Sequence, residues 1–65
     1  MSKIEFVEMT LKVHADTEKA VLVSDDGEAE KAVWLPKSQI EIYPLKDGNI
    51  MVVLPQWLAA DKGLI

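Results

Sequence analysis

Closely spaced turn signals are the feature that most restricts how this chain can fold. Asp-Gly pairs stand at positions 26–27 and 47–48, and prolines stand at positions 36, 44 and 55. Asp-Gly between two apolar runs is typical of a tight hairpin turn, and proline is confined to strand ends and edges. The stretches between these signals are rich in Val, Ile and Leu, which favours short strands over long helices. We therefore expect a mostly β fold.

The apolar runs predict five strands followed by a short C-terminal helix. Strands are expected within residues 4–14, 19–23, 31–35, 40–43 and 50–54, with a 3₁₀ turn at 36–39. Pro55 suits the first position of a helix of about two turns, and Gly63 suits its C-terminal cap. In the first strand the apolar alternation changes phase at Phe6-Val7, which predicts a β-bulge or a sharp bend there.

Five short strands with tight turns predict a curled antiparallel sheet that can be completed in two ways. The sheet either closes into a small SH3-like barrel or stays open and packs one face against the helix. The expected core consists of Phe6, Met9, Leu11, Val21, Val23, Val33, Leu35, Ile40, Ile42, Val52, Leu54 and Leu58.

Length and composition limit the kinds of site that the chain can build. Its 65 residues make a single domain, residues 1–65, that is too small for a deep cleft. Without Cys it has no disulfide or thiolate metal site, and His14, its one histidine, has no neighbouring His to share a metal. A glycine-rich phosphate loop is also missing. We therefore expect no enzymatic activity and no cofactor. No apolar run has the length of a leader or a membrane span, which indicates a protein of the cell interior.

The negative charge of the chain is concentrated in one segment. Eleven acidic residues oppose seven lysines, for a net charge of −4. Residues 16–30 alone carry −5, while residues 1–15 are neutral and residues 31–65 carry +1. In an extended strand, carboxylates two residues apart form a row that could imitate backbone phosphates for a basic partner protein. Acidic residues in hairpin ends also simply keep small domains soluble. The candidate partner-binding residues are Asp16, Glu18, Asp25, Asp26, Glu28 and Glu30.

Two motifs carry a resemblance to known proteins. WLPKSQI at 34–40 and LPQWLAADKGLI at 54–65 resemble a family of short proteins encoded by phages and other bacterial mobile elements, with the likeness covering residues 19–65. The chain is also similar to the small acidic anti-CRISPR proteins of Pseudomonas mobile elements, particularly those that act on type I-C systems. No motif residue carries over as a binding residue. Instead, we expect Trp34, Leu35, Ile40, Trp57 and Leu58 to pack the sheet against the helix.

The resemblance implies an anti-CRISPR inhibitor that acts in the cytoplasm of the bacterial host cell. It would bind a DNA-recognising Cas subunit as a monomer and block target DNA, through DNA mimicry by the acidic segment. A mobile-element accessory module that binds single-stranded nucleic acid or a replication protein is the alternative. That module would use Trp34 and Tyr43 with Lys31, Lys37 and Lys46. Direct nucleic-acid binding is opposed by the net negative charge, because phosphate contacts need an excess of basic residues.

Overall fold

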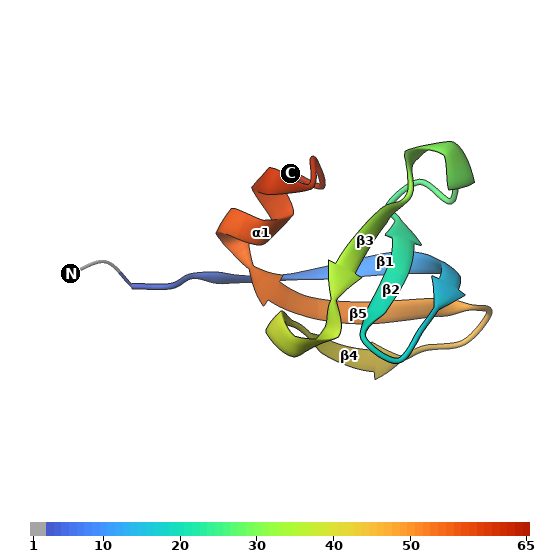
Figure 1. Cartoon of the computed structure of the whole chain (residues 1–65), viewed down its shortest axis with the longest axis horizontal. Coiled ribbons are helices and arrows are strands. Elements are labelled where there is room, and N and C mark those ends of the chain that lie inside the picture. The colour runs from blue at the N-terminus through green and yellow to red at the C-terminus, as the bar shows by residue number, and fades with distance from the viewer. Residues whose placement is uncertain (1–2) are drawn as a thin grey trace.

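One antiparallel sheet of five strands and a short C-terminal helix make up the fold of this protein (Figure 1). The computed structural model describes residues 3–65. The strands are β1 (Phe6–Asp16), β2 (Ala20–Ser24), β3 (Val33–Pro36), β4 (Glu41–Pro44) and β5 (Asn49–Pro55). The helical elements are the 3₁₀ turns η1 (Ala29–Lys31) and η2 (Lys37–Gln39) and the helix α1 (Gln56–Asp61). The mostly β fold predicted from the turn signals is confirmed.

The sheet is curled but open. Its strand order is β3-β2-β1-β5-β4, so β3 and β4 form the two edges and do not pair with each other. Only residues 37–40 connect these two edge strands. Because a residue spans at most about 3.6 Å, the five steps from Pro36 to Glu41 keep the edges within about 18 Å of each other at that corner. The short connection therefore curls the sheet, while the closed SH3-like barrel is not formed.

The core lies on the concave face of the sheet, where alternate residues of β1, β2, β3 and β5 form one cluster with residues of α1. Phe6 was expected there but is 61% exposed, because the alternation of β1 places it on the opposite face from Leu11. The predicted irregularity at Phe6-Val7 is also wrong, since pairing with β5 is continuous there and the register of β1 shifts between Val13 and Ala15 instead. The buried core consists of Leu11, Val21, Val23, Leu35, Ile50, Val52, Leu54, Leu58, Ala59 and Leu64. Met9, Val33, Ile40 and Ile42 pack against it as partly buried residues.

The C-terminal tail folds back onto the core after one left-handed residue. Pro55 is the N-cap of α1 and the last residue of β5, rather than the first helical residue as expected. Gly63 takes the left-handed conformation, with φ of 75°, which glycine adopts without steric cost. The Leu64 N–H then donates to the Ala59 carbonyl at 2.8 Å, and the Leu64 side chain is buried. Within residues 3–65 there is no helix long and apolar enough to cross a membrane.

Candidate functional site

The six acidic residues predicted to bind a partner lie in two separate turns at opposite ends of β2 (Figure 1). Asp16 ends β1, and Glu18 lies in the turn that follows it. Asp25, Asp26, Glu28 and Glu30 lie in the connection between β2 and β3. The four residue steps along β2 separate the two turns by about 14 Å. The segment that looks continuous in the sequence is therefore divided into two groups of carboxylates.

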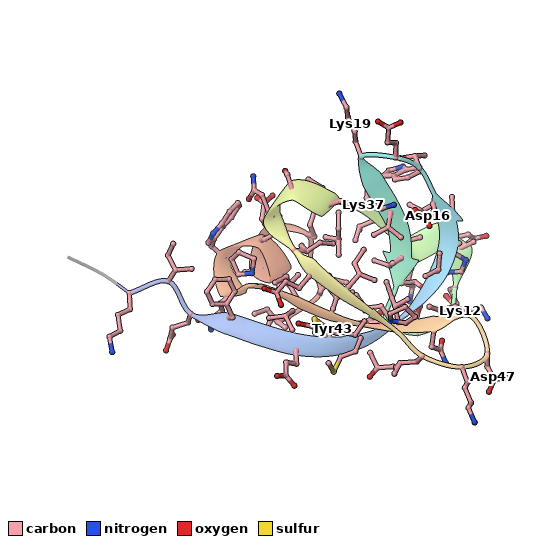
Figure 2. All side chains as sticks on the ribbon, turned by 90° about the horizontal axis from the view of Figure 1, so that it is seen from below. Lys12, Asp16, Lys19, Lys37, Tyr43 and Asp47 are labelled. Atoms are coloured by element: carbon pink, nitrogen blue, oxygen red, sulfur yellow. The ribbon has the colours of Figure 1, made fainter. Side chains whose placement is uncertain are left out.

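The turn between β1 and β2 is close to neutral. The Thr17 hydroxyl donates to the Ala20 carbonyl at 2.9 Å and accepts the Ala20 N–H at 3.1 Å, which fixes the turn. Asp16 is paired with Lys37, the first residue of η2, whose backbone N–H donates to the Lys19 carbonyl in this turn at 2.8 Å. Figure 2 shows these two side chains together, while Lys19 projects away from the sheet. The charge of Asp16 is therefore neutralised by Lys37.

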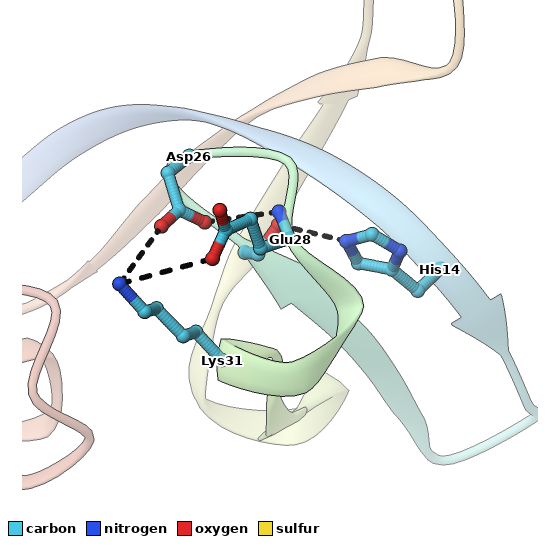
Figure 3. A network of polar contacts seen from close by, with 5 residues as sticks. His14, Asp26, Glu28 and Lys31 are labelled. Atoms are coloured by element: carbon cyan, nitrogen blue, oxygen red, sulfur yellow. Dashed lines mark hydrogen bonds and ion pairs between the residues drawn. The ribbon is translucent and has the colours of Figure 1, made fainter.

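Residues 25–31, which form most of the connection between β2 and β3, are called here the acidic loop. The Asp26 carboxylate accepts the Glu28 backbone N–H at 3.0 Å, and this bond organises the turn. The Lys31 ammonium lies 3.7 Å from Asp26 and 3.8 Å from Glu28, between the two carboxylates (Figure 3). The backbone hydrogen bond from Glu28, and then the charge of Lys31, hold the pKa of Asp26 below its usual value. The loop is thus a folded cluster with its own cation.

The acidic loop still keeps most of its negative charge. Its four carboxylates face one lysine, which leaves a net charge of −3. Within residues 3–65, Asp25 and Glu30 take part in no ion pair. The aliphatic part of the Lys12 side chain passes close to Gly27 in the loop. Its Cδ atom would lie 3.6 Å from a Cβ atom added at Gly27. Even with Lys12 counted, the surroundings of the loop remain negative by two charges.

The expected rows of carboxylates are not formed. Glu28 and Glu30 were expected to point to the same side of an extended strand, but Glu30 lies inside the 3₁₀ turn η1. That turn places residues three apart on one face, so carboxylates two apart diverge. In the other turn, Asp16 is the last residue of β1 and Glu18 lies beyond the strand. The carboxylates therefore present compact groups instead of a phosphate-like ladder.

A partly buried hydrogen bond supports the base of the acidic loop. Ser24, the last residue of β2, is almost completely buried, and its hydroxyl lies 2.7 Å from Nε2 of the half-buried His14 (Figure 3). No pattern in the sequence indicates that His14 has this partner, because Ser24 is ten positions away. Burial satisfied by a hydrogen bond is the ordinary arrangement for such groups. His14 therefore helps to hold the loop. Within residues 3–65, no three His, Cys, Asp or Glu residues lie close enough to hold a metal ion.

The aromatic residues of the two motifs differ from their neighbours in burial. Leu35 and Leu58 are buried as expected, but the adjacent Trp34 and Trp57 are about half exposed. Trp34 lies on β3 and Tyr43 on β4, the opposite edge strands of the sheet. The structure therefore does not join them in one stacking surface.

The comparisons with known proteins found no relative of this chain. No protein-family model, curated protein sequence or solved structure matched the chain. The candidate site therefore depends on the geometry of its own residues, with the acidic loop as its most highly charged part.

Proposed function

We propose that the chain is a non-enzymatic binding protein whose acidic loop docks on a basic surface of a partner protein. The observation that carries this proposal is the net charge of −3 on residues 25–31, with Asp25 and Glu30 outside any ion pair of the described chain. The loop projects from the end of the β2-β3 hairpin, where a partner can reach it (Figure 1). Such a charged projection speeds the encounter with a basic surface and selects against acidic ones.

The proposed partner is a DNA-recognising subunit of a CRISPR surveillance complex in the cytoplasm of a bacterial host. The resemblance of the motifs at 34–40 and 54–65 to mobile-element proteins, and the similarity of the chain to small acidic anti-CRISPR proteins, support this choice. A channel that binds DNA offers the Lys and Arg side chains that the loop requires. As a monomer, the protein would occupy part of that channel and prevent target DNA from entering it.

The shape of the loop narrows the proposed mechanism. Because Asp26 and Glu28 both contact Lys31, the carboxylates of the loop form a compact group instead of an extended row along a strand. It would displace a few adjacent phosphate contacts and leave the rest of the channel unmatched. Each contact between a basic side chain of the channel and a DNA phosphate contributes to affinity, and this contribution is largest at low salt. The loss of a few such contacts should therefore weaken DNA binding most strongly at low salt.

A competition assay tests this proposal with labelled target DNA and a purified type I-C surveillance complex. The native chain is expected to displace the DNA, and D25K/E30K is expected to lose at least tenfold in potency because two unpaired carboxylates are reversed. E5K/D61K changes the net charge equally at exposed acids outside the loop and serves as the matched control. Circular dichroism verifies that both variants fold. Equal potency of the two variants, or no displacement by the native chain, would refute the proposal.

The alternative, binding of single-stranded nucleic acid, is favoured by the exposure of Trp34 and Tyr43. It is opposed by the charges around them. Lys37 pairs with Asp16, and Lys31 lies between two carboxylates of the acidic loop. In the same assay, direct binding of the labelled DNA by the native chain in the absence of the complex would support this alternative.

A further inference from the structure

A second surface with unmatched charge lies on the convex face of the sheet, across β1, β5 and β4. Glu8 of β1 and Glu41 of β4 both pair with Val53 of β5 in the sheet register. Directly paired residues point to the same face, so the two carboxylates flank Val53, with Cα atoms about 9.6 Å apart. Tyr43, two residues along β4, shares this face with Glu41. Together with Phe6, these residues are called here the outer patch.

The two aromatic side chains of the outer patch are open to solvent. Phe6 is 61% exposed and Tyr43 is 46% exposed. Beside them lies a shallow open hollow of about 270 Å³, lined by Phe6, Ser38, Gln39, Ile40, Glu41 and Val53. Its volume is below that of ordinary small-molecule pockets, but a single side chain fits in it. Exposed aromatic groups beside a hollow are typical of protein contact surfaces.

The charge of the outer patch is hidden in the linear sequence. Residues 1–15 count as neutral because Lys3 and Lys12 offset Glu5 and Glu8. In the fold, however, Lys12 lies four positions further along β1 and its stem runs against Gly27 beside the acidic loop. Glu41 arrives from a distant part of the chain, and within residues 3–65 neither it nor Glu8 takes part in an ion pair. Two unmatched carboxylates therefore lie beside two exposed rings.

One carboxylate of the outer patch is held in place. The Tyr43 hydroxyl donates to one Glu41 oxygen at 2.6 Å, which leaves the second oxygen free to accept from a partner. This bond, and then the charge of Glu41, raise the pKa of Tyr43 above its usual value, which favours the protonated hydroxyl that donates to Glu41. A neutral ring next to a fixed carboxylate suits a cation that can stack on the ring and donate a hydrogen bond to the carboxylate.

The edge of β4 opposes docking by strand addition. The Leu45 N–H donates to the Asn49 carbonyl at 3.0 Å, and paired residues alternate between bonded and unbonded positions in an antiparallel ladder. The backbones of Ile42 and Pro44 therefore face away from β5, and Pro44 has no N–H to donate. With one outward N–H left, this edge is a poor template for another strand. A partner would contact the face of the sheet instead.

We propose that the outer patch binds an arginine side chain on the surface of a partner protein. The guanidinium would lie between Glu8 and Glu41 with its plane against the Tyr43 ring, and the neighbouring aliphatic side chain would enter the hollow. Arginine fits better than lysine because its planar fork donates in two directions at once and stacks on aromatic rings. Residues 1–65 contain no arginine, so a second copy of these residues cannot supply it. This proposal is independent of the acidic loop.

Nuclear magnetic resonance titration with the peptide acetyl-Val-Arg-Val-amide tests the proposal on the full chain. We expect saturable shifts centred on Glu8, Glu41, Tyr43 and Val53. Replacing the arginine of the peptide by citrulline, which has the same shape but no charge, is expected to weaken binding about five- to tenfold. The double variant E8Q/E41Q is expected to show the same loss, whereas E5Q/D61N, at exposed acids outside both the outer patch and the acidic loop, is expected to bind within twofold of the native chain.

Three results would overturn the proposal. Shifts centred on residues 25–31 would place the cation on the acidic loop, and equal binding of the citrulline peptide would show that charge is not recognised. Absence of saturable shifts up to about 10 mM peptide would show that the patch does not bind arginine at all. The citrulline comparison uses the native chain, so it decides the question even where E8Q/E41Q fails to fold.

Discussion

Truncating Leu64 to alanine should destabilise the protein far more than truncating its neighbour Ile65. Leu64 is 9% exposed and packs in the core with Leu58 and Ala59, while Ile65 is 59% exposed. Both side chains have the same number of carbon atoms and lie in the same tail. The pair therefore isolates the effect of burial.

The expected magnitude follows from the burial of Leu64. Buried Leu-to-Ala substitutions cost about 2–5 kcal/mol, and because Leu64 is still 9% exposed we expect the lower part of this range, about 2–3 kcal/mol. A domain of this length has a free energy of unfolding of about 3–10 kcal/mol, so the loss is a large fraction of the total. For small domains it corresponds to a fall in Tm of about 10–20 °C. For Ile65→Ala we expect less than about 1 kcal/mol.

Urea unfolding followed by tryptophan fluorescence and by circular dichroism measures both variants. Agreement of the two signals establishes that unfolding is two-state, as a single free energy requires. Similar losses for Leu64→Ala and Ile65→Ala, or a loss below about 0.5 kcal/mol for Leu64→Ala, would refute the docked tail and its contribution to the core.

Two titrations test the electrostatics. Tyr43 is the only tyrosine, so ultraviolet absorbance should show its pKa above 10.0 in the native chain and closer to 10.0 in Glu41→Gln; unchanged values would contradict the hydrogen bond to Glu41. Because the folded pKa is raised, the associated stability is complete below pH 10.0 and is lost as pH rises through the folded pKa. For Asp26, carbon-13 titration should give a pKa below 3.8, and its contribution should be present above pH 3.8 and be lost as pH falls through the folded value. Asp26→Asn keeps an oxygen that accepts the Glu28 N–H, so it should preserve the loop better than Asp26→Ala; equal exchange rates of that amide would contradict this.

Local signals in the sequence determine the hairpins of this fold. Asp47 and Gly48 both take positive φ, of 64° and 75°, as the turn between β4 and β5 requires. The 3₁₀ turn after Pro36 and the left-handed Gly63 were predictable for the same reason, since each depends on a few adjacent residues. Strand order and closure depend on distant pairings, and the sequence left the barrel and the open sheet undecided.

The side of the sheet that each apolar residue faces was harder to predict. Both faces carry apolar groups, with Val52 and Leu54 on the concave face and Val53 on the convex one. Alternation alone cannot choose between the faces when neither is purely polar. Phe6 was consequently assigned to the core, while Ile50, which is buried, was missed.

The positions of the carboxylates in turns were predictable, but their partners were not. Asp16 and Lys37 are 21 positions apart, and only the strand order brings them together. The same order places Glu41 across β5 from Glu8, which a charge count along the chain cannot detect. The predicted ladder of Glu28 and Glu30 is not formed, because the connection between β2 and β3 contains a 3₁₀ turn where an extended strand was assumed.

Carboxylate footprinting is the most direct test of the claim that the acidic loop is the contact surface. Carbodiimide labelling followed by mass spectrometry measures the solvent access of individual Asp and Glu side chains, with and without the type I-C surveillance complex. We predict that Asp25, Glu28 and Glu30 lose labelling on binding, while Glu5 and Asp61 keep theirs. Unchanged labelling of the loop in a complex that has released its target DNA would contradict the account.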